Sequence, residues 1–161
     1  VSDRPIQRWF YFVRTAIEAS EGCLGEIGSE LPSIRSRTEK ANVLLEALWQ
    51  RLLSFHAVAQ ASAAPVRIDW SAPPLSDQIA WVRKGNTKKH PSHPGWYVPV
   101  HDARREVHLL RLHLRQLEKA IAAVPLPAHL QRATTAIAGD LARYARAVAA
   151  VESRAGKSPV S

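Results

Sequence analysis

The sequence predicts an all-α protein, a four-helix bundle with a long crossover between its second and third helices. Two observations predict this fold. Apolar residues recur every three or four positions in four long segments, as on the buried face of a helix. Six of the 11 prolines lie in residues 63–100, where they prevent a long helix. A chain of 161 residues suffices for one domain, which we place at residues 1–156, with a disordered tail at 157–161.

The first two predicted helices cover residues 5–21 and 34–62. The buried face of the first consists of Ile6, Phe10, Val13 and Ile17. Gly22, followed by two further glycines, is expected to end it, because glycine is a poor helix former. Ser33 is the expected cap of the second helix. Its buried positions step by four and three throughout: Ile34, Thr38, Ala41, Leu45, Leu48, Leu52, Phe55 and Ala59.

The third predicted helix covers residues 103–124, with Asp102 as its cap. Its buried positions are Val107, Leu110, Leu114, Leu117, Ile121 and Val124. The fourth begins at residue 127 or 128 and reaches residue 154. Its inward positions are Leu130, Thr134, Ile137, Leu141, Tyr144, Val148 and Val151. Gly139 inside this helix indicates a close approach of two helices.

The crossover at residues 63–100 contains a predicted short helix over residues 74–84, closed by Gly85. Several aromatic residues surround this helix: Trp70, Trp81, Trp96 and Tyr97. A long connection with this many aromatic residues is expected to lie across the bundle and to end in an exposed basic tip.

The net charge of +8 is concentrated in the middle of the chain. Residues 83–115 carry eight basic side chains against Asp102 and Glu106 alone, whereas residues 1–82 carry eight against nine acidic ones. Five of the seven histidines fall in the same block. Such a cluster attracts polyanions or acidic protein surfaces, and both kinds of partner stay open at this point.

The candidate site is a nucleic-acid-binding surface made of the crossover tip and one stripe of the third helix. Lysines and arginines neutralise phosphates, while a tryptophan offers a face on which a base can stack. Positions 104, 108, 111 and 115 repeat at four, three and four, which places them on one side of the helix. The candidate residues are Arg83, Lys84, Lys88, Lys89, Trp96, Arg104, Arg105, His108, Arg111 and Arg115.

No metal site and no cofactor are predicted. His90 and His93 have a ligand-like spacing, but prolines surround the pair and no cysteine supports it. Cys23 is the single cysteine, which excludes an internal disulfide. The histidines are therefore expected to add partial positive charge to the basic surface.

The segment from Arg51 to His56 offers an enzymatic alternative. An arginine and a histidine with four residues between them on a helix resemble the motif of the HEPN ribonucleases, small helical bundles that dimerise. The resemblance implies that Arg51 stabilises a phosphate and that His56 transfers a proton. Without a phosphate-binding glycine loop, a nucleophile elbow or an acidic cluster, we expect no catalytic residue elsewhere and favour a non-enzyme.

The size, the helical content and the basic face together resemble the small helical subunit of multi-subunit class 1 CRISPR ribonucleoproteins. The resemblance implies a non-catalytic subunit that holds RNA or DNA by the backbone, beside other subunits and copies of itself. A structural or adaptor bundle that binds an acidic protein is the other alternative. The absence of a long apolar run and of a signal peptide predicts a cytoplasmic protein with no membrane partner.

Overall fold

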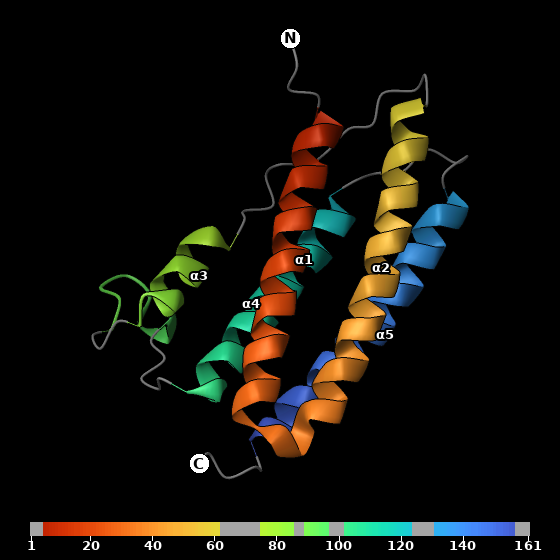
Figure 1. Cartoon of the computed structure of the whole chain (residues 1–161). Coiled ribbons are helices and arrows are strands. Elements are labelled where there is room, and N and C mark those ends of the chain that lie inside the picture. Colours follow the sequence, from red (N-terminus) through yellow and green to blue (C-terminus); the bar gives the residue numbers. More distant parts are fainter. Residues whose placement is uncertain (1–4, 62–74, 86–88, 97–101, 124–130, 157–161) are drawn as a thin grey trace.

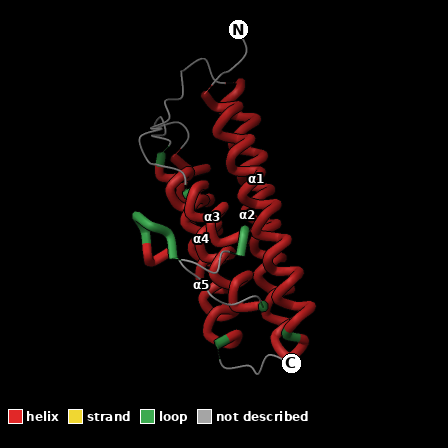
Figure 2. The backbone as a smooth tube through the Cα atoms, turned by 90° about the vertical axis from the view of Figure 1, so that its left-hand side faces the viewer, coloured by secondary structure: helices red, strands yellow, loops and turns green. Residues whose placement is uncertain are grey.

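A computed structural model of the chain describes residues 5–61, 75–85, 89–96, 102–123 and 131–156. Within these ranges the protein is all-helical and without strands, as predicted (Figures 1 and 2). Five α-helices pack together, and two short 3-10 turns accompany them. Their bounds are α1 Pro5–Glu30, η1 Pro32–Ile34, α2 Arg35–Ala61, α3 Ser76–Arg83, η2 Pro94–Trp96, α4 Ala103–Ala122 and α5 Gln131–Ala155.

The long helices pack as antiparallel neighbours. Helix α1 packs against α2 and α4, and α5 packs against α2 and α4. Figure 1 shows that α2 ends at one end of the molecule and that α4 begins at the other. The short α3 lies outside this group, beside α4 (Figures 1 and 2). No helix among the described residues is long and apolar enough to cross a membrane.

Helix α1 is nine residues longer than predicted, because Gly22 does not end it. The buried face continues beyond the glycine through Cys23, Leu24 and Ile27. Burial of apolar side chains contributes more than the roughly 1 kcal/mol that a helical glycine costs. The helix stops only at Glu30, where the chain turns into η1.

Gly28 permits the close approach of α1 and α2 at this turn. A Cβ atom at Gly28 would lie 2.7 Å from the Thr38 hydroxyl oxygen, whereas one at Gly22 or Gly25 would meet nothing within 4 Å. The Thr38 hydroxyl itself donates to the Arg35 carbonyl oxygen at 2.8 Å. The three glycines of α1 therefore have different roles, although their spacing in the sequence is regular.

We expect alanine at Gly28 to lower the free energy of unfolding by about 1–3 kcal/mol, because the methyl group overpacks the turn. Gly22→Ala and Gly25→Ala serve as matched controls and should each raise it by about 0.5–1 kcal/mol, since both positions are exposed and helical. Urea titration measures all three values. Adding Thr38→Ala should relieve the Gly28→Ala loss, and a stabilising Gly28→Ala would show that the turn is loose.

The predicted seam of α2 is confirmed. All of its positions are buried, from Ile34 in η1 to Ala59. Ser33, the predicted cap, lies inside the 3-10 turn, and α2 follows that turn directly.

Helix α4 matches its prediction at the N-terminus, where the Asp102 carboxylate accepts the Arg104 N–H at 2.9 Å. Its predicted seam is buried from Val107 to Leu117, and Ile121 is half-buried. A further set of buried positions was not predicted: Leu109, Leu112, His113 and Gln116. These residues lie on a second side of the helix, and packing of α4 against α3 as well as α1 and α5 gives it more than one covered face.

Helix α5 begins at Gln131 in the described part, and the predicted start at residue 127 or 128 lies outside it. Ile137, Tyr144, Val148 and Val151 are buried as predicted, whereas Thr134 and Leu141 are half-buried; Leu130 lies outside the described residues, as do Val124 of the third helix and the predicted tail. The close helix approach predicted at Gly139 is wrong. A Cβ atom there would meet only the guanidinium group of Arg143 on the same helix.

Candidate nucleic-acid interface

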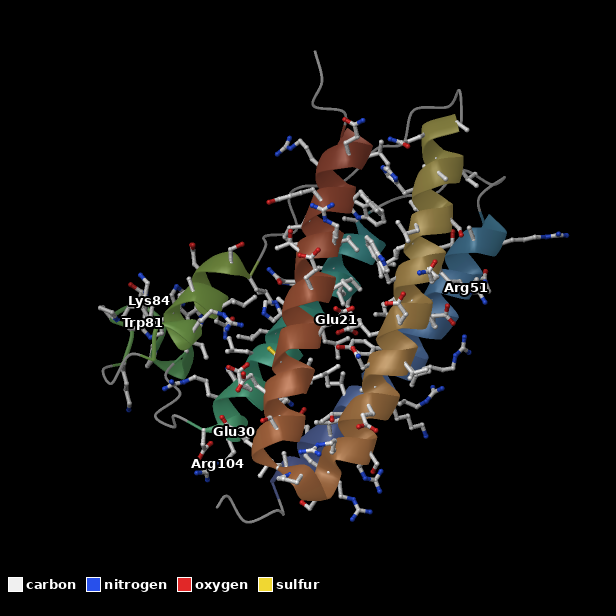
Figure 3. All side chains as sticks on the ribbon, viewed as in Figure 1. Glu21, Glu30, Arg51, Trp81, Lys84 and Arg104 are labelled. Carbon is white, nitrogen blue, oxygen red and sulfur yellow. The ribbon has the colours of Figure 1, made fainter. Side chains whose placement is uncertain are left out.

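The predicted basic tip begins at the end of α3, and its described residues are 83–85 and 89–96. Ile79 and Val82 are buried on the inner side of α3. The helix ends at Arg83, one residue before the predicted end, and Gly85 closes it as predicted. The φ of Gly85, 69°, favours glycine, and its N–H donates to the Val82 carbonyl oxygen at 3.1 Å. Figure 3 shows Trp81 and Lys84 at the outer end of the tip. Buried contacts on one side of α3 therefore leave the other side free to meet a partner.

Four aromatic rings gather beside this tip, and we call them the ring cluster: Trp81, His90, His93 and Trp96. The centroids of His93 and Trp96 lie 4.1 Å apart with the rings only 13° from parallel. His90 contacts Trp81 edge-on at 4.6 Å and Trp96 at 4.7 Å. The sequence prediction included Trp96 alone from this cluster. The close spacing of histidine, proline and tryptophan in residues 90–96 is the sequence feature that could have predicted the other rings.

Exposed cations flank the ring cluster. Arg83, Lys84 and Lys89 are exposed, while Lys88 lies outside the described residues. Within the described ranges, no carboxylate forms an ion pair with Lys84 or Lys89. These two ammonium groups therefore stay available for an external anion, as far as the described residues are concerned.

Arg83 is partly directed inward. Arg83 lowers the pKa of the Cys23 thiol and of the His113 imidazole, whereas Glu106 raises both pKa values. The side chains of Arg83 and Glu106 therefore lie near these two buried groups. Burial raises the pKa of Cys23 to about 12, with Glu106 adding to the effect. The thiol is therefore inert near neutral pH. Arg83 contributes less to the outer positive surface than Lys84 and Lys89.

The three arginines of the predicted stripe on α4 are exposed, but two of them have acidic partners. Arg104 pairs with the Asp102 carboxylate at 2.7 Å, and Arg111 pairs with Glu152 of α5 at 3.1 Å. Arg115 is exposed and, within the described residues, has no carboxylate in ion-pair contact. Tertiary packing therefore brings a carboxylate, that of Glu152, beside the predicted stripe.

Arg105 and His108 are half-buried rather than exposed. Two guanidinium nitrogens of Arg105, Nε and Nη2, are buried without a hydrogen-bond partner among the described residues, and His108 Nε2 is in the same situation. Because these nitrogens are buried, they add little to the outer positive surface.

Two histidines of the basic block do not add positive charge at neutral pH, contrary to the prediction. Burial lowers the pKa of His113 below its usual 6.5, and the nearby Arg83 acts in the same direction. Burial also lowers the pKa of His108, and repulsion from Arg111 and Arg115 adds to it. Both imidazoles are therefore mainly neutral at pH 7. His101 lies outside the described residues.

Arg51 and His56 contact different helices. The Arg51 Nε donates to the Asp140 carboxylate of α5 at 2.6 Å, and Arg143 donates to the other oxygen of that carboxylate. The His56 ring instead stacks on Phe10 of α1, with the centroids 4.0 Å apart. Burial lowers the pKa of His56. Nothing in these contacts brings the two side chains to one phosphate.

A groove of about 450 Å³ runs between α2 and α5, and Arg51 lies on its wall. Its lining mixes apolar and polar side chains: Ala47, Gln50, Arg51, Ser54, Phe55, Val58, Ala133, Ala136 and Asp140. Figure 3 shows Arg51 on the opposite side of the molecule from Trp81 and Lys84. Among the described residues, no three histidine, cysteine, aspartate or glutamate side chains come together as a metal site.

No protein-family model, no curated protein and no solved structure matches this chain. The candidate interface therefore depends on the residues themselves. It consists of the ring cluster, the ammonium groups of Lys84 and Lys89, and the exposed side of α4 at Arg115.

Proposed function

We propose that this chain is a non-catalytic nucleic-acid-binding subunit that holds the phosphate backbone without sequence specificity, within a larger ribonucleoprotein or DNA-processing assembly. The observation that carries the proposal is the pair of exposed lysines, Lys84 and Lys89, which have no ion pair among the described residues. They lie near the ring cluster, in which His93 is exposed and the other three rings are half-buried. Exposed cations next to rings favour a polynucleotide over an acidic protein, because phosphates and bases use both.

The finer architecture belongs to the same proposal. We infer that α1, α2, α4 and α5 form a four-helix bundle and that residues 63–100 cross over between α2 and α4. This arrangement would carry the basic tip outward on α3. The likeness in size, helical content and charge to the small subunit of class 1 CRISPR ribonucleoproteins supports a place among other subunits, including further copies of the chain.

Replacing Lys84 and Lys89 together with alanine should weaken binding and make it less dependent on salt. Each lost phosphate contact flattens the plot of log affinity against log salt by about 0.9 units for duplex DNA and about 0.7 for single strands. The double variant should therefore flatten it by about 1.8 or 1.4 units. Fluorescence anisotropy with a labelled oligonucleotide at several salt concentrations measures the slope.

The matched control is Arg14→Ala with Lys40→Ala, which removes the same charge from exposed positions on α1 and α2. This control should leave the slope within error, because neither position belongs to the proposed tip. Equal slopes for the parent and the Lys84/Lys89 variant would rule out the tip as the phosphate site. Degradation of RNA by the parent, and not by His56→Ala, would instead favour the ribonuclease alternative.

A further inference from the structure

We propose that the ring cluster is a stacking platform for unpaired bases, so that the chain binds single-stranded nucleic acid in preference to duplex. This inference depends on the proposed function, because it names the form of nucleic acid that the same tip accepts. It assigns the outer ring of the platform to His93, supported from beneath by Trp96.

The rings of this cluster lie apart from the aromatic residues of the core. In the core, Trp9 contacts Phe55, and Phe10 contacts Trp49 and His56. The rings of the ring cluster instead contact one another: Trp81 contacts His90, and His90, His93 and Trp96 contact each other. Such rings are not needed to fill the interior between the long helices. Their concentration at one tip therefore indicates a role other than core packing.

The cluster is exposed on its outer side. Every residue from Pro91 to Gly95 is exposed, whereas His90, Trp96 and Trp81 are half-buried. His93 remains exposed although its ring lies nearly parallel to Trp96 at 4.1 Å. An aromatic ring supported on one side and exposed to solvent can stack on a base without first displacing protein.

The backbone holds the cluster in place before any ligand binds. His90 Nδ1 accepts two backbone N–H groups, those of Ser92 and His93, each at 3.1 Å. The Trp96 N–H donates to the His93 carbonyl oxygen at 3.0 Å. Pro91 and Pro94 further restrict the backbone of this turn. Because the rings are ordered beforehand, stacking a base on them costs less conformational entropy.

Stacking on this platform requires a base whose face is free. In a duplex the base faces already stack on their neighbours, whereas in a single strand they can turn outward. Lys84 and Lys89 are exposed near the cluster and can neutralise the phosphates that flank the stacked base. Because His90 Nδ1 accepts two backbone N–H groups, its neutral imidazole carries the proton on Nε2, and neither nitrogen offers a lone pair to a metal ion.

The experiment compares a labelled oligothymidylate with a mixed-sequence duplex of equal length, using the full chain and fluorescence anisotropy. The parent should bind the single strand more tightly. His93→Ala and Trp96→Ala should each weaken single-strand binding by about 5- to 150-fold, the equivalent of ~1–3 kcal/mol for one stacked base. Duplex binding should change less than about twofold. His93→Phe keeps a ring and should retain most of the affinity, and Ser92→Ala is the control for the turn.

The tryptophan fluorescence of the parent should also be quenched on binding oligothymidylate, and Trp96→Phe should show much less quenching while keeping its fold by circular dichroism. Equal losses on single strand and duplex, or no loss in His93→Ala and Trp96→Ala, would overturn the platform. If binding still depends on Lys84 and Lys89 in that case, the proposed function survives without it. If the parent binds neither nucleic acid, and instead an acidic protein occupies the tip, both proposals fail.

Discussion

Trp9→Ala is expected to lower the free energy of unfolding by about 3–5 kcal/mol, the range for truncating a large buried aromatic side chain. Trp9 is 2% exposed and lies where α1, α2 and α4 meet. Its indole N–H donates to the carbonyl oxygen of Ala120 in α4 at 2.7 Å, and its ring meets Phe55 of α2 edge-on at 5.5 Å. The substitution therefore removes packing from three helices and leaves a cavity.

The matched control for this experiment is Tyr11→Ala, which removes an aromatic side chain that is 64% exposed on the same helix. It should change stability by less than about 0.5 kcal/mol. Trp9→Phe keeps most of the volume but removes the hydrogen bond to Ala120, so its loss should fall between the two. Denaturant midpoints for the three variants provide the comparison. Similar midpoints for Trp9→Ala and Tyr11→Ala would mean that the α1–α4 contact is not packed as described.

Leu48→Ala is expected to cost about 2–5 kcal/mol. Leu48 is fully buried in the middle of the α2 seam, between Leu45 and Leu52, which are also fully buried. The neighbouring helices α1 and α5 hold this part of α2 from two sides, so the cavity cannot collapse easily. A site with little freedom to relax lies toward the upper part of that range.

Val43→Ala is the control for the α2 seam, since Val43 is 69% exposed on the same helix. Alanine has the higher helix propensity, so this variant should be neutral or slightly stabilising. Thermal and urea unfolding should both show that Leu48→Ala is less stable than Val43→Ala. The opposite order would mean that the buried face of α2 is wrongly assigned.

The periodicity of the sequence by itself determined the helices and most of their buried faces. The seam of α2 and the cap of α4 at Asp102 follow from side-chain spacing and local hydrogen bonding, and both are found as predicted. The closure of α3 by Gly85 follows from the same local rules, because a positive φ favours glycine. These features depend on residues close in sequence, so a pattern of spacings is enough to predict them.

Only the tertiary structure decided which glycine ends a helix and which arginines form ion pairs. Gly22 does not end α1, because Cys23, Leu24 and Ile27 find a buried environment that the sequence does not display. Two carboxylates of α5 form ion pairs with other helices. Glu152 pairs with Arg111 of α4, 41 residues away along the chain, and Asp140 pairs with Arg51 of α2, 89 residues away. His113 becomes buried, and its pKa falls, on a side of α4 that the apolar period did not predict. Charge, burial and pairing depend on neighbours distant in sequence, and folding alone brings these neighbours together.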